Sequence, residues 1–362
     1  MFDRTVYFAS QNARVAWFLG QYLLSQRLSR PAAARSRPQP RRRRAAPSLR
    51  DLLADIVALQ RRDWERIRSG VYRAPAPTLE EAAKLLDDAL RYFRDLPEVT
   101  ARRRRDGFDD VRQTVAAAGT LPDYYCRNFH YQTDGYLSEH SARLYDQQVE
   151  VLFMGSADLM RRQALPPIAS FLDRHPGEAV LLDIGCGTGR FLDSVLDSFP
   201  RLRAVGVDLS LPYLAEAARL LRPRRASLLL RGLAETVPLA SGSIDVITCV
   251  YLLHEVPACV RERIAGEMAR VLRPGGRLVI LECTPARGLI GKCAGFYINR
   301  VVPWVGNALS SSPQKAYSYL ADSIAVFPSA NELAERMKAA GFKEVTFRKL
   351  NLGTMAIHVG QV

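Results

Sequence analysis

Three glycines and one carboxylate in the middle of the chain have the types and spacing of a ligand-binding loop. The segment LLDIGCGTGR spans residues 181–190 and places Gly185, Gly187 and Gly189 in a G-x-G-x-G pattern. Glycine is needed where a tight turn brings bare backbone against a ligand. Asp208 lies nineteen residues beyond the third glycine. A carboxylate at that spacing can accept hydrogen bonds from both ribose hydroxyls of an adenosine.

The residues around the loop decide which adenosine cofactor it fits. A pyrophosphate prefers G-x-G-x-x-G, whose third glycine lets the following helix approach the phosphates. Here Arg190 follows the last glycine, and Asp183 precedes the turn. A carboxylate in that position repels phosphate and suits a cationic amino-acid group. We therefore expect S-adenosylmethionine rather than a nicotinamide dinucleotide.

These residues need a strand before the loop and a helix after it, and the surrounding pattern supplies both. After residue 178, short β-branched and Leu-rich runs alternate with helical patterns, which predicts a parallel sheet covered on both faces. The predicted strands are 179–183, 203–208, 226–231, 244–250 and 277–282, and the predicted helices lie near 189–199, 211–222 and 257–272. A helix near 330–340 and strands at 343–350 and 354–360 would add a final hairpin and one antiparallel strand.

The segments before this α/β region have a different texture. Residues 48–118 have the pattern of helices, with breaks expected at Pro75, Pro77 and Pro97. Residues 120–140 gather five aromatic side chains around a histidine. We expect ordinary core packing there rather than a cover over a ligand pocket.

The basic charge of the chain is concentrated at the N-terminus. The chain has 362 residues and a net charge of +14, and residues 1–50 hold eleven Arg and a single acid. The remainder is only mildly basic, so we expect no nucleic-acid substrate. Within residues 11–26 an apolar helical face is predicted from Val15, Phe18, Leu19, Tyr22 and Leu23.

This amphipathic segment is followed by a Pro/Arg-rich stretch that cannot pack a core. An aromatic-bearing amphipathic helix before a polybasic arm suits an anionic membrane surface, so residues 11–50 are a candidate membrane contact. A helix docked on its own protein is one alternative. An organellar transit peptide is another, because the region is Arg-rich and poor in acids.

The cysteines and the hydropathy pattern indicate the compartment. Six cysteines occur without a C-x-x-C pair, so we expect a reducing compartment, no disulfide framework and no metal site. No run of about 18 apolar residues is present, and no signal-peptide pattern begins the chain. We expect a cytoplasmic protein that is either soluble or attached to a membrane surface.

Longer stretches of the chain resemble a known family. Residues 180–285 resemble class I S-adenosylmethionine-dependent methyltransferases, including IDVITCVYLLHEVP and VLRPGGRLVILE. Residues 288–362 more narrowly resemble the ubiquinone/menaquinone biosynthesis C-methyltransferase family, in FYINRVVPWVG, AYSYLADSIAVFPSANEL and AGFKEVTFRKLNLGTMAIHVG. The resemblance implies a Rossmann-like seven-stranded sheet with a largely helical N-terminal extension. We divide the chain into a helix and basic linker (1–47), a helical extension (48–140) and a methyltransferase domain (141–362).

The resemblance also implies which residues contact the cofactor. Its methionine end would lie at Asp183, Gly185, Cys186, Gly187, Thr188 and Gly189; its ribose at Asp208; its adenine against Leu209; and Val250 would lie beneath it. Where the family usually has Gly-Asp-Ala-Glu, this chain has Gly232, Leu233, Ala234 and Glu235. The acid expected at the adenine amine is therefore missing, and Glu235 or backbone groups are the candidate substitutes.

The implied reaction is C-methylation of a prenylated benzoquinol or naphthoquinol in quinone biosynthesis. The ring carbon becomes nucleophilic when an adjacent phenolic proton is lost. His254 is the candidate base, Arg300 could stabilise the phenolate without titrating, and Tyr319 is a third candidate. The alternative for His254 is a structural role at the start of a helix, and the alternative for Tyr319 is packing around a lipid tail. Glu255 and Glu282 also follow strands that end at the predicted site.

Two other functions stay open at this point. One is methylation of another lipid-soluble or aromatic acceptor, such as a pigment or tocopherol-like precursor. The other is a non-catalytic, cofactor-fold scaffold in a biosynthetic complex, which Leu233 favours and the intact glycine loop disfavours. The expected partners are a lipid-soluble quinol, a membrane surface, and either copies of the chain or a biosynthetic complex.

Overall fold

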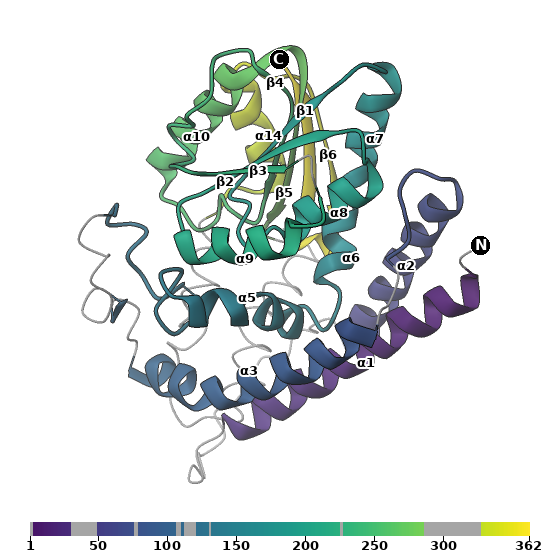
Figure 1. Ribbon diagram of the computed structural model, residues 1–362, viewed down its shortest axis with the longest axis vertical. Helices are drawn as coiled ribbons and strands as arrows, with labels where there is room; N and C mark the ends of the chain where they lie inside the picture. Colours follow the sequence, from purple (N-terminus) through teal and green to yellow (C-terminus); the bar gives the residue numbers. More distant parts are fainter. Residues whose placement is uncertain are drawn as a thin grey trace, which may run out of the picture.

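The sheet expected from the sequence is present in full. The computed structural model describes residues 3–29, 49–75, 79–105, 110–111, 121–129, 132–224, 227–285 and 327–362. The described strands form a seven-stranded sheet in the order β3-β2-β1-β4-β5-β7-β6 (Figure 1). Their bounds are β1 Val180–Ile184, β2 Arg203–Asp208, β3 Ser227–Arg231, β4 Ile244–Val250, β5 Leu272–Cys283, β6 Lys343–Leu350 and β7 Met355–Gln361. The predicted Rossmann-like sheet is confirmed.

One strand runs against the others. Strands β1 to β5 pair in parallel, whereas β7 is antiparallel to both β5 and β6. The final hairpin, joined through η4 (Asn351–Gly353), therefore inserts β7 between β5 and the edge strand. This confirms the single antiparallel strand that the C-terminal pattern predicts.

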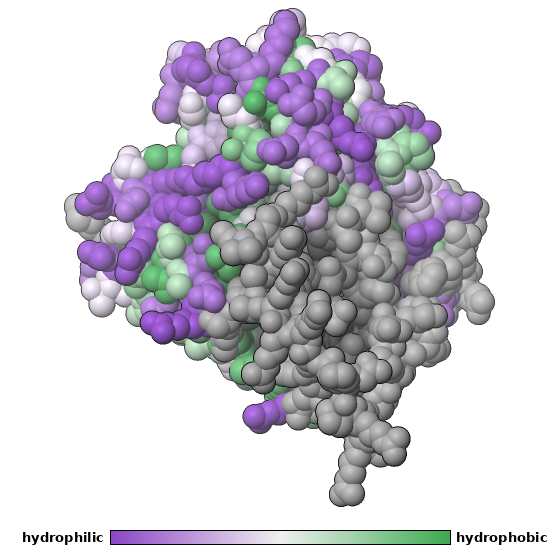
Figure 2. All heavy atoms as spheres, turned by 180° about the vertical axis from the view of Figure 1, so that it is seen from behind, coloured by the Kyte–Doolittle hydropathy of each residue, from purple (hydrophilic) through white to green (hydrophobic). Residues whose placement is uncertain are grey.

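Helices cover both faces because successive strand residues point to opposite sides. In β1, Leu181 packs into one apolar cluster with α7 and α8, and Leu182 packs into the other with α10 and α14. The covering helices are α7 Leu165–Arg174, α8 Arg190–Ser198, α9 Leu211–Leu221, α10 Ala258–Val271 and α14 Ala330–Ala339. A capping box at Ser329 and Glu332 begins α14. Seen from behind in Figure 2, hydrophilic side chains dominate the described surface over this domain.

A layer of further helices lies beyond the carboxyl ends of the parallel strands (Figure 1). They are α1 Arg4–Leu28, α2 Leu49–Arg68, α3 Leu79–Arg105, α5 Glu139–Leu152 and α6 Ala157–Arg162. The expected break at Pro97 is wrong, because α3 continues through it. Leu96 and Val99 on either side of it are buried, so packing outweighs the hydrogen bond that proline cannot make.

Helix α1 is docked on its own protein. Its N-terminus is capped by Asp3, and it contacts α2, α3 and α5. Tyr7 donates to the fully buried carboxylate of Asp63 at 2.5 Å, and Arg162 of α6 binds the same carboxylate at 2.8 Å. Among the described residues, no helix combines the length and the apolar character needed to span a membrane.

Candidate functional site

A pocket lies where the carboxyl ends of the parallel strands meet the helical layer. It contains about 790 Å³ of empty space, part of it open to solvent. Residues that follow β1, β2, β3 and β4 form one side, and aromatic residues from 121–136, α5 and α9 form the other. The lining residues are Tyr124, Tyr125, Phe129, Tyr136, Tyr145, Gly185, Gly187, Val207, Asp208, Leu209, Tyr213, Gly232, Leu233, Ala234, Glu235, Val250, Tyr251, Leu252, Glu255 and Val256.

The glycine loop has the geometry of a ligand cradle. Gly185, Gly187 and Gly189 have φ values of +73°, +55° and +77°, which side chains rarely adopt. A Cβ on Gly187 would meet nothing within 4 Å, so this pocket-lining backbone faces open space. A Cβ on Gly189 would lie 3.1 Å from the Cβ of Ala217, so that glycine permits close packing of α9 instead. The loop therefore fits a ligand held against bare backbone.

The two carboxylates singled out by the sequence have different positions. Asp208 lines the pocket, where its Oδ2 accepts from the Gly187 N–H and its Oδ1 from the Ser210 N–H, both at 2.9 Å. Asp183 is behind the loop: it is 2% exposed and its Oδ1 accepts from Thr248 Oγ1 at 2.7 Å. Burial raises the pKa of Asp208, and it raises that of Asp183 to about 7.

The turn after β3 contributes a carboxylate despite its altered sequence. Leu233 occupies the position of the missing acid and forms an isolated bridge with Thr236. This turn brings Glu235 into the pocket wall. Its Oε1 accepts from Tyr124 Oη at 2.7 Å and lies 3.7 Å from Arg263. Tyr124 of the N-terminal extension thus holds the Glu235 carboxylate, which lies two residues after the position of the missing acid.

Four aromatic residues of the 120–140 cluster, namely Tyr124, Tyr125, Phe129 and Tyr136, line the pocket, so the expectation of ordinary core packing is wrong for them. Phe129 and Tyr136 stack with ring centroids 4.7 Å apart, and Tyr145 and Tyr213 pack edge-on against Tyr136. Ser210 Oγ donates to the Tyr136 carbonyl at 2.5 Å, which ties the cover to the end of β2. Burial raises the pKa of Tyr145 to about 12, so it stays a neutral hydroxyl. Hydrophobicity alone cannot separate a core from a cover.

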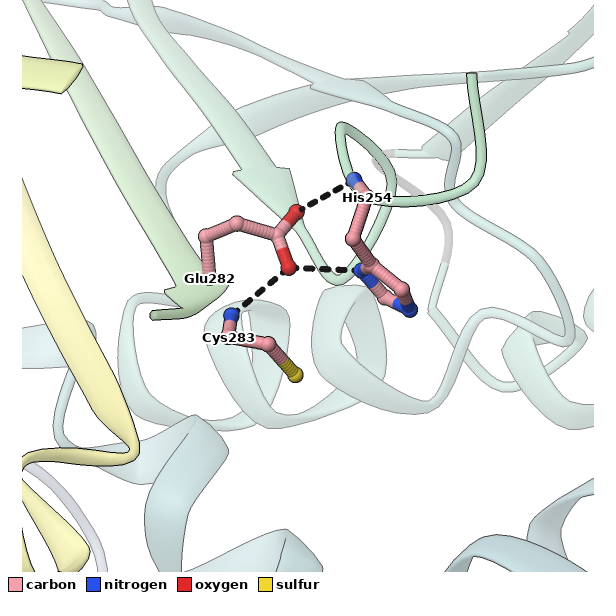
Figure 3. A group of neighbouring side chains, drawn as sticks. All are labelled: His254, Glu282 and Cys283. Carbon is pink, nitrogen blue, oxygen red and sulfur yellow. Dashed lines mark hydrogen bonds and ion pairs between the residues drawn. The ribbon is translucent and has the colours of Figure 1, made fainter. Parts of the chain in front are cut away.

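Three charged side chains form a connected unit beside this aromatic wall. Figure 3 shows His254, from the loop after β4, pointing at Glu282 near the end of β5. His254 Nδ1 lies 2.6 Å from Glu282 Oε1, and its Nε2 lies 3.2 Å from Glu255 Oε1. Tyr136 Oη donates to the same Glu255 oxygen at 3.2 Å. Glu255 is the member of the unit that lines the pocket.

The electrostatics of the unit follow from its burial. Burial opposes the charged imidazole, but the carboxylates of Glu282 and Glu255 outweigh it and raise the pKa of His254 well above its usual value. The two carboxylates therefore favour the charged form of the His254 ring over the neutral form. Glu282 is fully buried and also accepts backbone N–H bonds from Leu253 at 2.8 Å and Cys283 at 2.7 Å.

Cys283 completes a group that resembles a metal site in composition. Potential ligand atoms of His254, Glu282 and Cys283 lie within 4.8 Å of one another. The Glu282 oxygens are already engaged by ring and backbone nitrogens, as Figure 3 shows. Burial raises the pKa of the Cys283 thiol to about 12, which disfavours the thiolate that metals bind. The hydrogen bond between His254 and Glu282 accounts for the closeness of these side chains without a metal ion.

The structure brings together most of the residues expected at the cofactor. The pocket wall contains Gly185, Gly187, Asp208, Leu209, Ala234, Glu235 and Val250. The other four are set back from it, namely Asp183, Cys186, Thr188 and Gly189. Thr188 Oγ1 donates to Asp146 of α5 at 2.9 Å, and the Cys186 sulfur packs against Gly206.

Two of the three expected catalytic residues, Arg300 and Tyr319, lie outside the described residues. His254 is close to the pocket but behind Glu255. The tyrosines of the cover were missed as site residues. The clustering of aromatic side chains in residues 120–140 was the available signal.

Comparison with known proteins agrees with this geometry. The family model of the ubiE/COQ5 methyltransferase family matches residues 136–362. A demethylmenaquinone methyltransferase of Roseiflexus sp. is 39% identical over 49% of this chain and 74% of its own length. The corresponding Thermus thermophilus protein is 35% identical over 60% of this chain and 95% of its own. A ubiquinone/menaquinone biosynthesis C-methyltransferase of Desulfotalea psychrophila is 32% identical over 60% and 85%. This chain therefore belongs to the ubiE/COQ5 methyltransferase family and is an S-adenosylmethionine-dependent methyltransferase.

Proposed function

We propose that this methyltransferase methylates a ring carbon of a prenylated benzoquinol or naphthoquinol. The observation that carries the proposal is a carboxylate, Glu255, set in an aromatic wall beside the cofactor loop. Flat rings of Tyr136, Tyr145 and Tyr251 suit a planar aromatic acceptor, and the carboxylate suits its hydroxyl proton. The names of the three relatives support the same substrate class.

The residues of the pocket wall support one orientation of the cofactor. Asp208 would accept from the ribose hydroxyls, and Leu209 and Ala234 would contact the adenine. Glu235 would accept from the adenine amine with the oxygen that Tyr124 does not engage. The backbone of Gly185 and Gly187 would lie along the methionine part. The set-back Asp183, whose pKa burial raises to about 7, would attract the cationic end through its charge once it is ionised.

When bound, S-adenosylmethionine supplies an electrophilic methyl group on a sulfonium sulfur. The protein must orient the acceptor and remove its phenolic proton. We assign this proton transfer to Glu255, whose carboxylate takes the proton from the quinol oxygen and leaves a phenolate that is nucleophilic at the neighbouring carbon. After the new C–C bond forms, that ring carbon loses its own proton and the oxygen regains one, so one proton is released per methyl group.

His254 and Glu282 would act through Glu255. Glu282 holds His254 through Nδ1 at 2.6 Å, and Nε2 of the same ring lies 3.2 Å from Glu255 Oε1, so the pair would hold that carboxylate at the pocket wall. Because the neighbouring carboxylates raise the pKa of His254 and its ring lies behind Glu255, we assign it a positioning role in place of the expected base. Arg300 and Tyr319 stay proposals for phenolate stabilisation and for the acceptor wall.

Two alternatives keep support from particular residues. The aromatic wall would also accept another lipid-soluble or aromatic ring, such as a pigment precursor. Leu233, in place of the usual acid, is the feature that favours a scaffold without catalysis. The Glu235–Tyr124 pair weighs against the scaffold because it supplies a carboxylate at the same end of the pocket.

We infer further that the enzyme works as a peripheral protein on a membrane surface, either within a larger assembly or with copies of itself. A prenylated acceptor partitions into lipid, so an enzyme bound at that surface meets it more often. The Arg-rich stretch after α1 supports an anionic surface.

The test of the reaction is the fate of the methyl group. Purified protein would be incubated with methyl-labelled S-adenosylmethionine and detergent-solubilised demethylated quinols under reducing conditions, and mass spectrometry would locate the label. Label on a ring carbon is the expected result. Label on a different acceptor from a lipid extract would favour the second function, and cofactor binding without any transfer would favour the scaffold.

The proposed base is tested by Glu255→Gln, which keeps the size of the side chain. We expect a fall in kcat of about 10²- to 10⁴-fold with cofactor affinity retained. The matched variant Tyr136→Phe removes only a hydrogen-bond donor to Glu255, so its kcat should fall much less. A Glu255→Gln enzyme with normal kcat would exclude this carboxylate as the base.

A further inference from the structure

Helix α1 presents an apolar face to solvent, opposite to the one it buries. Its buried positions are Tyr7, Gln11, Phe18, Gln21 and Ser25. Its exposed apolar positions, here called the outer face, are Val6, Ala9, Ala13, Ala16, Trp17, Gly20, Leu23, Leu24 and Leu28. Trp17 is 40% exposed and Leu28 is 60% exposed. A surface helix normally has charged residues on this side.

This orientation of α1 is fixed by polar contacts on its inner side. Gln147 of α5 donates to Gln21 at 2.6 Å, and Arg14 pairs with Glu150 of α5 at 2.9 Å. Tyr7 donates to Asp63, whose carboxylate is fully buried. Rotating the helix to bury its outer face would leave these groups unpaired, which is costly inside a protein. The apolar outer face is therefore a stable feature of the fold.

The sequence next to the outer face indicates what covers it. Residues 30–50 directly follow the helix and contain eight Arg and no acid. Arg27 lies at the same end of α1 and is exposed. A tryptophan-bearing apolar face that is followed in sequence by an Arg-rich stretch complements a lipid surface with anionic headgroups. We propose that the outer face of α1 binds an anionic membrane surface.

The position of α1 relates this contact to the methyl-transfer site. Its inner side packs on α5, which contributes Tyr145 to the pocket wall. Arg14 also pairs with Asp158 at 3.1 Å, and Asp158 pairs with Arg190 at the end of the glycine loop at 2.8 Å. Figure 1 shows this helical layer beyond the carboxyl ends of the parallel strands, which is the end of the sheet that contributes residues to the pocket. The inference rests on the attachment to a membrane surface proposed above and assigns that attachment to one face of α1.

The experiment measures binding of the full-length protein to vesicles. Phosphatidylcholine vesicles would be compared with vesicles that also contain phosphatidylglycerol, by co-sedimentation. In a background of Trp64→Phe and Trp304→Phe, the emission of Trp17 reports on its surroundings. We expect binding and a blue shift with the anionic vesicles only, with both reduced by added salt.

Variants on the outer face test which side of the helix makes the contact. Trp17→Gln and Leu24→Gln should each weaken vesicle binding about tenfold or more, because each removes one apolar side chain that the lipid would bury. The matched control is Leu228→Gln, an exposed leucine in the edge strand β3, which should bind as the wild type does. Circular dichroism and S-adenosylmethionine titration check that every variant is folded.

Other outcomes overturn the proposal. Equal binding by wild type and outer-face variants would exclude the face as the lipid contact. A dimer in light scattering that Leu24→Gln dissociates, with no vesicle binding, would assign the face to a second copy of the chain. Methylation of a short-chain, water-soluble quinol separates the proposed reaction from the membrane contact. If the wild type does not methylate this quinol, only the proposed reaction is refuted. Methylation of the quinol without vesicle binding refutes only the membrane contact.

Discussion

Asp183 allows a quantitative test of the electrostatics behind the cofactor loop. Its side chain is 2% exposed. Burial, partly offset by the Thr248 hydrogen bond and reinforced by the charge of Asp208, raises its pKa to about 7. We predict that Asp183→Asn becomes progressively more stable relative to the wild type as the pH rises.

The magnitude follows from the two pKa values of Asp183. An unfolded aspartate titrates near pH 3.9, so between about pH 4 and pH 7 the unfolded chain is ionised while the folded protein keeps its proton. The stability that this proton supports is complete below the unfolded pKa and is lost as the pH rises through the folded one. A gap of about three in pKa, at about 1.4 kcal/mol each, amounts to about 4 kcal/mol. Between about pH 5 and pH 8 we expect a change of about 2–3 kcal/mol.

The assay is urea unfolding of both proteins, followed by circular dichroism across this pH range. The new amide also needs a hydrogen-bond partner, but that cost does not depend on pH and cancels when differences are compared. Thr248→Val removes the hydrogen bond that lowers the pKa of Asp183. In that variant the fall of stability with rising pH should therefore continue to higher pH than in the wild type. A constant gap between wild type and Asp183→Asn from pH 5 to pH 8 would refute the assigned cost of burial.

Three other perturbations test the unit at the site, the anchor of the extension and the loop. Stability supplied by the His254 imidazolium is complete below about pH 6.5 and is lost as the pH rises through its raised folded pKa. Glu282→Gln should move this loss of stability to lower pH in a series of thermal unfolding curves. If the pH midpoint of the loss does not change, the pairing of His254 with Glu282 is not its cause. Asp63→Asn leaves the Arg162 guanidinium buried without its carboxylate and should cost about 3–5 kcal/mol in urea unfolding. Asp63→Leu combined with Arg162→Met should recover most of the lost stability. If Asp63→Asn alone is as stable as the wild type, the Asp63–Arg162 pair does not anchor the N-terminal extension. Gly187→Ala imposes a side chain at φ +55° and should cost about 1–2 kcal/mol in stability; calorimetric titration should show a larger loss of S-adenosylmethionine affinity, and an unaffected affinity would place the cofactor elsewhere.

Much of the fold could be predicted because its signals are local. The strand before the glycine loop, the helix after it and the acid at the end of β2 are contiguous in sequence, and the structure has them at the predicted positions. Pro97 shows the limit of local rules, since the helix through it is held by contacts with distant segments. The amphipathic pattern of α1 likewise predicted a helix correctly. Phe18 of its expected apolar face is buried, whereas Leu23 is exposed.

The sequence by itself determined the α/β architecture, the glycine loop and the type of cofactor, because each depends on residue type at fixed short spacing. Only the tertiary structure decided which groups share the pocket. Glu255 and His254 are neighbours in the chain, yet one faces the pocket and the other is held behind it by Glu282, a strand away. Tyr124 and Glu235 are 111 residues apart and share a hydrogen bond. Such contacts arise from the pairing of strands and the packing of helices, which bring distant residues to one edge of the sheet.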